Sequence, residues 1–393
     1  MRLNVYLNSF GKRKYVGVLE EVGHRILFEY APEFIAERIN ISPFMLPLQS
    51  GVFEDKKQTF DGLYGLFNDS LPDGWGCLLL DRALQKKGLS LQQIMPLKRL
   101  SIIGQNAMGA LEYEPITEHE DEFIGGIELD SLCAEANRIL EGESSEVLEK
   151  LLTLNGSSGG ARPKIVALVS EDKQKIIHGN VAKEDFSPWI IKFASSLDGK
   201  DIGAQEYIYS LIAKQAGVEM PETYLFPSKT SVGHFGVKRF DRNGTQKIHV
   251  HTACGLLHAS HRYASIDYSD LLKLTFILTK DIREVEKMVR LMIFNVKSGN
   301  KDDHSKNFSF LLDENNNWKL TPAYDLTPSE GINGEQTAMV NAKGKDITTQ
   351  DFIKTAEPFG IAAKKTMEIV ERTEDALSTY PKYAKEFGVN KKG

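Results

Sequence analysis

The fold class of this chain is decided by residues 298–329, SGNKDDHSKNFSFLLDENNNWKLTPAYDLTPS. Residues 282–298 lead into it with apolar side chains at helical spacing, which predicts a helix that ends at Gly299. FSFLL and WKLTPAYD then predict the two strands of a hairpin across DENNN. Because a hairpin returns the chain to its starting point, Asp325 is expected to lie beside the loop GNKDDHSKN. We therefore expect Asp302, Asn307 and Asp325 to converge.

These three side chains form a set suited to phosphoryl transfer. In that reaction one carboxylate orients the attacking hydroxyl and accepts its proton, while a second carboxylate and an amide oxygen bind the magnesium ion that bridges the nucleotide phosphates. Asp302 and Asn307 have the D-x-x-x-x-N spacing of the protein-kinase catalytic loop, and Asp325 takes the place of the DFG aspartate. The usual HR before the first aspartate is NK here, and DLT replaces DFG. The same spacing also occurs in solvated loops, so the assignment depends on the hairpin and on a glycine loop upstream.

That glycine loop is NGSSGGARPK, residues 155–164, and it leads directly into a predicted strand. Its glycines permit backbone N–H groups to point at an anion, and Arg162 and Lys164 add positive charge. It is not a Walker A sequence, because no G-K-[ST] follows. A flexible linker is the alternative interpretation, and the immediate entry into a strand favours a loop that covers phosphate.

Lys192 is a cation inside an apolar strand, WIIKF. Such a lysine either faces an edge of the sheet or is buried and needs an acidic or phosphate partner. Glu206, on the helix predicted over 202–216, is a candidate partner, as in the strand-lysine and helix-glutamate pair of kinases. We expect Lys192 to contact nucleotide.

The bulk composition is that of an ordinary soluble globular protein. The chain has 393 residues, of which 41% are hydrophobic and 26% charged, and a formal net charge of -6. This balance argues against a protein whose main task is to coat nucleic acid. Cys77, Cys133 and Cys254 are too few and too far apart for a disulfide framework or a zinc cluster, and we expect them to be buried and reduced. No apolar run reaches the length of a signal core or a membrane span, so we expect a cytoplasmic protein.

Other chemistries have little support in the sequence. The histidines at 249, 251, 258 and 261 fit no zinc-site spacing with a nearby acid, and we expect them on the surface or in loops. No G-x-S-x-G elbow and no recognisable Cys/His pair is present, so acyl transfer has no support.

The order of the predicted elements indicates an α+β chain with a strand-rich half followed by a helix-rich half. Residues 1–30 alternate as strands, and 74–87 predict a helix. We expect three domains: an N-terminal β-rich module (1–115), a linker helix with a strand-rich nucleotide-binding lobe (116–240), and a helical lobe with the catalytic loop (241–393).

Several segments together resemble one known family. GGARPK, WIIKF, FGVKRFDR, GNKDDHSKNFSF and TPAYDLTPS occur in the order found in HipA-like serine/threonine kinases, the toxin components of bacterial type II toxin–antitoxin systems. GLFNDSLPDGWG and GQNAMGALEYEP look like the N-terminal module of that family. The resemblance runs from about residue 1 to at least 330 and implies an α+β, two-lobed protein-kinase-like (HipA-like) fold.

The resemblance also implies roles for individual residues. Asp302 is implied as the catalytic aspartate, with Asn307 and Asp325 as magnesium ligands. Ser157, with Ser158 adjacent, matches the serine that members autophosphorylate to silence the kinase. The positions that match ATP-contacting residues are Gly159, Gly160, Ala161, Arg162, Lys164, Lys192, Lys238, Arg239, Phe240, His304 and Tyr324.

Two positions depart from the family pattern. Asp303 stands where a glycine is common and is expected to add negative charge beside the catalytic aspartate, with an effect on its pKa or on the metal requirement. Lys238 stands where an acidic residue occurs, which leaves backbone contacts to adenine as the expected role of that position.

The function that the resemblance implies is an ATP- and Mg²⁺-dependent protein kinase toxin. Its partners would be a HipB-like helix-turn-helix antitoxin bound through the N-terminal module (1–115), operator DNA mainly through that antitoxin, and a protein substrate such as an aminoacyl-tRNA synthetase. No membrane would be involved. Three alternatives stay open: a small-molecule kinase of the same fold, a catalytically silent corepressor scaffold, and a metal-dependent nuclease that uses Asp302, Asp303 and His304.

Overall fold

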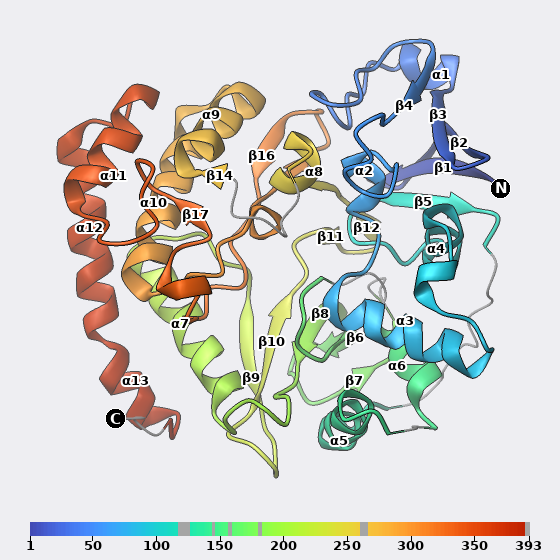
Figure 1. Ribbon diagram of the computed structural model, residues 1–393. Coiled ribbons are helices and arrows are strands. Elements are labelled where there is room, and N and C mark those ends of the chain that lie inside the picture. Colours follow the sequence, from blue (N-terminus) through green and yellow to red (C-terminus); the bar gives the residue numbers. More distant parts are fainter. Residues whose placement is uncertain (117–125, 144–145, 156–158, 180–182, 260–265, 390–393) are drawn as a thin grey trace. The chain divides into compact units, whose positions relative to one another are not determined.

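The computed structural model describes residues 1–116, 126–143, 146–155, 159–179, 183–259 and 266–389 (Figure 1). The chain divides into two compact units, each made of segments that are distant in the sequence. The first comprises Met1–Gly203 and Tyr224–Val250, and the second comprises Ala204–Thr223 and His251–Gly393.

A five-stranded antiparallel sheet in the first unit is built mainly from the N-terminal residues. In β1, Leu3, Val5 and Leu7 are buried and the residues between them are partly exposed, which is the half-buried alternation predicted for residues 1–30. The order in the sheet is β4-β3-β2-β1-β5. The strands are β1 (Arg2–Ser9), β2 (Lys12–Val22), β3 (Arg25–Tyr30), β4 (Val52–Glu54) and β5 (Leu111–Glu114).

Short helices occupy the chain between β3 and β5. The helix predicted over 74–87 is confirmed as α3, and it is followed by Gly88, whose φ of 71° is the left-handed conformation that commonly ends a helix. The helices are α1 (Pro32–Ala36), α2 (Gly65–Asn68), α3 (Gly74–Lys86), η1 (Leu91–Gln93) and α4 (Pro96–Ile103).

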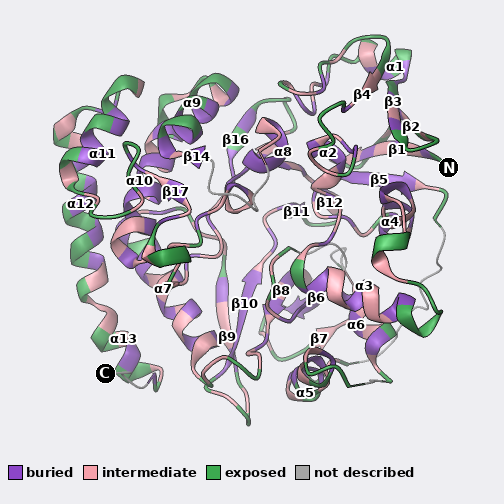
Figure 2. Ribbon diagram, viewed as in Figure 1, coloured by how far each residue is buried: buried purple, intermediate pink, exposed green. Residues whose placement is uncertain are grey.

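A second five-stranded sheet of the first unit has the order β7-β6-β8-β10-β9. Every residue of β6 is buried, and all residues of β10 except Lys238 are buried, as the colours of Figure 2 show. Apolar residues of α3, α5 and α6 pack with β6 and β8 in one core that includes Trp75 and Trp189. The strands of this sheet are β6 (Lys164–Ser170), β7 (Ile176–Ile177), β8 (Phe186–Lys192), β9 (Thr223–Phe226) and β10 (His234–Lys238). The helices are α5 (Leu129–Leu140) and α6 (Leu148–Asn155), and β11 (Arg242–Asn243) and β12 (Gln246–Lys247) form a separate two-stranded sheet.

The second unit is mostly helical, as the sequence predicted for its C-terminal part. Its small sheets are β13-β15-β16 and the parallel pair β14-β17. The strands are β13 (His249–Thr252), β14 (Ile266–Asp267), β15 (Ser309–Leu312), β16 (Trp318–Leu320) and β17 (Ala338–Met339). The helices are α7 (Ile202–Ala216), α8 (Ala253–Leu257), α9 (Tyr268–Thr279), α10 (Ile282–Ser298), η2 (Ser305–Asn307), η3 (Ile332–Gly334), α11 (Thr349–Ala356), η4 (Glu357–Phe359), α12 (Ala363–Ser378) and α13 (Tyr380–Glu386).

The α10 helix and the hairpin after it confirm the structural predictions made from residues 282–329. Val285, Met288 and Met292 are fully buried, as the apolar stripe requires. The helix ends at Gly299, whose φ of 76° is left-handed, and β15 pairs with β16 through Phe310 and Leu320.

Two of the histidines correct the interpretation made from their spacing. His249 and His251 lie in β13 and are buried, rather than on the surface or in a loop. His249 Nε2 contacts the carbonyl oxygen of Ile41 at 3.0 Å. Ile41 lies 208 residues before His249, so no local sequence pattern reports this contact. His261 lies outside the described residues.

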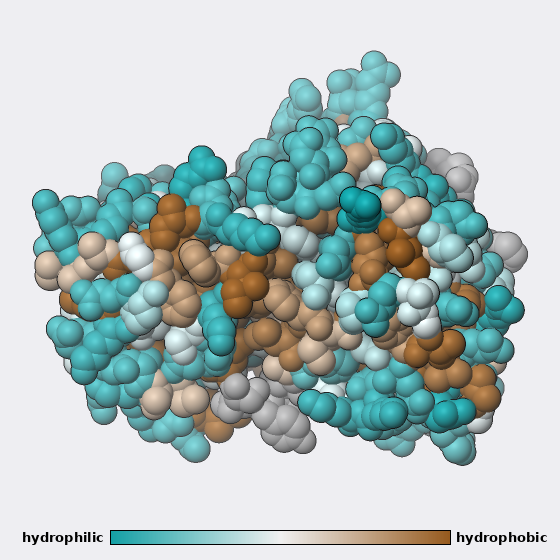
Figure 3. Space-filling view, turned by 90° about the horizontal axis from the view of Figure 1, so that it is seen from above, coloured by the Kyte–Doolittle hydropathy of each residue, from teal (hydrophilic) through white to brown (hydrophobic). Residues whose placement is uncertain are grey.

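Hydrophilic residues cover much of the face drawn in Figure 3, with apolar residues between them. In the part of the chain that the structure describes, no helix is both long enough and apolar enough to span a membrane. Cys77, Cys133 and Cys254 form no disulfide bond; Cys133 and Cys254 are buried as expected, whereas Cys77 is partly exposed.

Candidate active site

The loop after α10 is held to the segment after the β15–β16 hairpin. Asn300 Nδ2 donates to the carbonyl oxygen of Asp325 at 3.0 Å and to Asn295 Oδ1 at 3.0 Å. Asn307 Nδ2 donates to the carbonyl oxygen of Asp302 at 2.7 Å. The hairpin therefore returns Asp325 beside the loop, as the sequence predicted.

The side chains of this loop differ sharply in exposure. The Asp302 side chain is 68% exposed, and its Oδ1 lies 3.9 Å from Nε2 of His304. The amide nitrogen of Asn307 is committed to Asp302, so its Oδ1 is the atom that could bind a metal ion. Asp325 has a φ of 53°, a left-handed conformation that is uncommon outside glycine and is often found at functional sites.

Tyr324 and Asp303 have structural contacts that the sequence did not reveal. The Tyr324 hydroxyl donates to the carbonyl oxygen of Lys306 at 2.7 Å and also contacts Ser309 Oγ, so it holds the segment after the loop. Asp303 was expected to add charge beside Asp302. Instead its side chain is fully buried, and burial raises its pKa above the usual range.

In the first unit, the start of α3 holds the described part of the glycine loop. Gly160 N donates to Asp73, and Trp75 N donates to the Gly160 carbonyl oxygen at 3.0 Å. Gly74 permits this approach, because a Cβ there would lie 2.6 Å from the Gly160 carbonyl oxygen. Ser157 and Ser158, the predicted autophosphorylation sites, lie outside the described residues.

The two predicted phosphate-binding lysines are neighbours on one sheet. Lys164 on β6 is the cross-strand partner of Lys192 on β8, so both side chains leave the same face. Adjacent like charges are unfavourable by themselves, and an anion between them would relieve the repulsion. The Lys164 ammonium donates to the Gly159 carbonyl oxygen, and Arg162 pairs with Asp198 at 3.6 Å. Glu206 is buried on α7 in the second unit, and its pairing with Lys192 stays a prediction.

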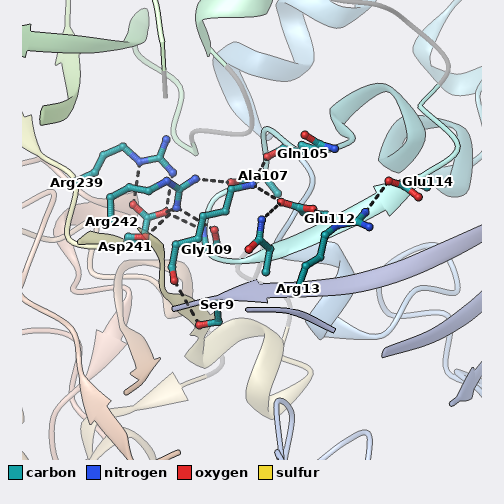
Figure 4. Close-up of polar contacts among 12 residues, drawn as sticks. Ser9, Arg13, Gln105, Ala107, Gly109, Glu112, Glu114, Arg239, Asp241 and Arg242 are labelled. Carbon is teal, nitrogen blue, oxygen red and sulfur yellow. Dashed lines mark hydrogen bonds and ion pairs between the residues drawn. The ribbon is translucent and has the colours of Figure 1, made fainter. Parts of the chain in front are cut away.

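Lys238, Arg239 and Phe240 lie at the end of β10 and just after it, and the Arg239 side chain is engaged inside the protein. Its Nε and Nη2 donate to Asp241 at 2.8 and 2.7 Å, and both side chains are 1% exposed. The same carboxylate accepts from Arg242 Nη1 at 2.8 Å and from Gly109 N at 2.8 Å (Figure 4). Any contact from Arg239 to adenine therefore has to come from its backbone.

This cluster continues into the N-terminal residues through Glu112. Lys247 Nζ and Arg13 Nε each donate to the Glu112 carboxylate at 2.8 Å. Burial would raise the pKa of Glu112, but Lys247 and Arg13 outweigh it and hold that pKa below the usual value. Burial likewise opposes ionisation of Asp241, and the two guanidinium groups hold its pKa well below the usual range. We define the Asp241 network as Arg13, Glu112, Arg239, Asp241, Arg242 and Lys247.

A metal ion bound to the described residues would have few protein ligands. No three or more His, Cys, Asp and Glu side chains there gather into a group that could hold a metal ion. Magnesium in phosphoryl-transfer sites is commonly held by one or two protein oxygens, with phosphate and water completing its shell. Asn307 and Asp325 supply oxygen donors of that kind.

Two family models together match most of the chain. The HipA-like C-terminal domain matches residues 156–380, which is more than half of the chain, and the HipA N-terminal domain matches residues 3–114. The chain belongs to the HipA family. The resemblance noted from the catalytic segment and the glycine loop is thereby confirmed.

A solved HipA structure shows the fold. It is that of HipA from Shewanella oneidensis MR-1, in a toxin–antitoxin complex with HipB and its operator DNA. The TM-score is 0.70 at 19% identity, and the match covers 98% of this chain and 90% of that one. The predicted α+β, two-lobed protein-kinase-like fold is confirmed.

Curated relatives match the chain over a shorter span. Proteins from Sinorhizobium fredii and Haemophilus influenzae, named "Putative kinase Y4dM" and "Putative kinase", are each 28% identical, over 167 and 139 residues. These matches cover 39% and 32% of this chain, and the chain spans only 40% of the length of each relative.

Proposed function

We propose that this HipA-family chain is an ATP- and Mg²⁺-dependent serine/threonine protein kinase that acts as the toxin of a toxin–antitoxin pair. One observation carries the proposal. The catalytic loop presents Asp302 to solvent, and hydrogen bonds tie that loop to Asn307 and to the backbone of Asp325. The kinase names of the two curated relatives support the general assignment.

In the proposed reaction, Asp302 accepts the proton of a serine hydroxyl as the hydroxyl oxygen bonds to the γ-phosphorus of ATP. The bond from that phosphorus to the β,γ-bridging oxygen breaks, and ADP leaves. Magnesium would supply positive charge that neutralises the charge developing on the phosphates. Asn307 and Asp325 would hold it, and the exposure of Asp302 leaves room for a protein hydroxyl to approach.

The glycine loop and the paired lysines would bind the phosphates of ATP. Lys164 and Lys192 project from one face of the sheet and could share an anion between them. Gly160 N–H and the Lys164 ammonium now bond to Asp73 and to the Gly159 carbonyl. Phosphate would compete for these donors, so the loop is expected to rearrange when ATP binds.

The partners follow by analogy with the structural relative. That HipA was solved with HipB and operator DNA. We propose that residues 1–115 of this chain bind a HipB-like helix-turn-helix antitoxin, which makes the main contacts with DNA. A protein such as an aminoacyl-tRNA synthetase would be the phosphate acceptor.

Incubation of the purified chain with Mg-ATP is expected to add phosphate to Ser157 or Ser158. The measurement is intact mass followed by phosphopeptide mapping, with a Ser157→Ala/Ser158→Ala variant as the matched control. Phosphate that is absent from both serines, despite measured ATP binding, would favour a small-molecule kinase. Absence of both phosphate and ATP binding would favour a corepressor scaffold, and DNA cleavage without ATP would favour a nuclease.

Replacing Asp325 with alanine is expected to weaken ATP binding when magnesium is present and to change it little when magnesium is chelated. The reason is that the variant loses a carboxylate ligand of the ion that bridges the phosphates. Calorimetric titration of ATP with and without Mg²⁺ measures both values. An equal loss under the two conditions would mean that Asp325 acts through the fold rather than through the metal.

A further inference from the structure

Asp302 lies on a segment that has no regular secondary structure of its own. Residues 300–304 join α10 to η2, and the Asp302 side chain is 68% exposed. A general base must be held within a few tenths of an ångström of its working position, and a misplacement of about 1 Å can cost about 10²-fold in rate. Contacts of the neighbouring residues therefore have to position Asp302.

The next residue, Asp303, turns its side chain into the core, where it is 0% exposed. Its two carboxylate oxygens accept hydrogen bonds from three donors. Oδ2 accepts from the Tyr268 hydroxyl at 2.9 Å and from Gln336 Nε2 at 3.0 Å, and Oδ1 accepts from Ala338 N at 3.0 Å. The donors come from the start of α9, from β17 and from the residues just before β17, so Asp303 ties the loop to two separate parts of the second unit.

The same contacts continue to the other side of Asp302 and on to Asp325. Gln336 Nε2 also donates to the carbonyl oxygen of Asn300 at 2.9 Å, and Asn295 Nδ2 donates to the Tyr268 hydroxyl at 3.0 Å. Asn300 in turn contacts Asn295 and the carbonyl oxygen of Asp325. Hydrogen bonds thus hold the chain immediately before and immediately after Asp302, and the same network reaches the proposed metal ligand.

An ionisable side chain in this place is costly for folding. Burial raises the pKa of Asp303, because the core disfavours its charged form. A glycine at this position would avoid that cost but would make none of the three contacts. The buried carboxylate of Asp303 therefore lowers the stability of the fold, while its three hydrogen bonds hold the loop that carries Asp302.

We propose that Asp303 is a positioning residue that sets the place of Asp302 through its hydrogen bonds to Tyr268, Gln336 and Ala338. The inference rests on the proposed kinase function for its catalytic consequence, although the positioning itself is a property of the loop. Tyr268 and Gln336 act as its supports.

The test compares Asp303→Asn with Asp351→Asn, a matched change of a second buried aspartate in the same unit. Asp351 is 2% exposed and accepts hydrogen bonds from Asn341, Lys343 and Thr348, so its contacts join α11 to the segment before it and include no residue of the 299–307 loop. Both variants lose one buried carboxylate charge. Only Asp303→Asn affects hydrogen bonds of the loop that carries Asp302. The amide nitrogen of the asparagine cannot accept a hydrogen bond, so at least one of the donors Tyr268, Gln336 and Ala338 loses its acceptor.

Two readouts separate positioning from plain stability. The first is deuterium uptake by the peptide that spans 299–307, measured by mass spectrometry on the full chain below its unfolding temperature. The second is the maximal rate of self-phosphorylation and the ATP concentration that gives half of it. We expect Asp303→Asn to raise the uptake and to lower the maximal rate by about 10- to 100-fold, with the half-saturating ATP concentration changed by less than about twofold. Asp351→Asn is expected to lower the melting temperature without either effect.

Each outcome decides the inference. If Asp303→Asn only lowers the melting temperature, as Asp351→Asn does, Asp303 is structural and the inference is wrong. If the wild-type chain does not transfer phosphate to itself, self-phosphorylation is wrong, and the deuterium uptake alone still decides the positioning role. If Asp303→Asn does not fold, Tyr268→Phe replaces it, since this change removes one donor and keeps the ring; unchanged uptake in that variant would overturn the inference.

Discussion

Asp302→Asn is expected to lower the rate of phosphate transfer by about 10²–10⁴-fold, the usual contribution of one positioned general base. The asparagine side chain cannot accept the proton of the attacking hydroxyl. Because Asp302 is mostly exposed, the change should leave the melting temperature close to that of the wild type. ATP binding should also persist, since the proposed magnesium and phosphate contacts are made by other residues.

The rate is measured as incorporation of labelled phosphate at saturating Mg-ATP, and ATP binding is measured separately by calorimetry. Asp313→Asn serves as the matched control, because Asp313 lies in the turn of the adjacent hairpin and pairs with Lys319 at 2.9 Å. That control should transfer phosphate at the wild-type rate. Equal rates in wild type and Asp302→Asn would mean that the catalytic assignment is wrong.

Residues 282–329 could be predicted from sequence because their signals are local. An apolar stripe at helical spacing, a glycine that ends a helix, and two short strands around a turn are each recognisable from residues that are close together in the sequence. Together these local signals predict that Asp325 lies beside the loop after α10, without information on long-range contacts.

The environment of Asp303 could not be predicted in this way. Its donors Tyr268, Gln336 and Ala338 lie 35, 33 and 35 residues away, and a carboxylate within a run of hydrophilic residues is normally solvated. The contact of Gly160 with Asp73 spans 87 residues, and no periodic pattern reports it. Sequence reasoning could therefore propose Asp302, Asn307 and Asp325 as candidate reacting groups and ligands, but it missed the residues whose contacts hold them.

The Asp241 network is the clearest case of such missed residues. Gly109 N donates to Asp241 across 132 positions, and Lys247 donates to Glu112 across 135. These contacts join the N-terminal residues to the strand end that carries Lys238, Arg239 and Phe240. The resemblance assigned adenine contacts to this strand end, and the structure adds what fixes it.

Asp241→Asn is expected to lower the free energy of unfolding of the first unit by about 3–5 kcal/mol. Removal of the carboxylate leaves the Arg239 and Arg242 guanidinium groups buried without their counter-charge, and breaking a buried ion pair in this way typically costs that much. The change is measured by urea unfolding, with deuterium uptake of peptides from the first unit as the signal. The matched control is Glu114→Gln, which removes a half-exposed partner of Arg13 and should cost about 0–1 kcal/mol.

The pH dependence of the free energy of unfolding of Asp241→Asn distinguishes the loss of a charge from a change in packing. The pKa of Asp241 is held well below its usual value in the folded chain, so its ionised form stabilises the fold at neutral pH. That stabilisation is lost as the pH falls below the ordinary carboxyl pKa of about 3.9 and through the lower folded value. The gap in stability between wild type and Asp241→Asn should therefore be constant near neutral pH and narrow below about pH 4. A gap that stays the same in acid would mean that packing, rather than the charge of Asp241, stabilises this network.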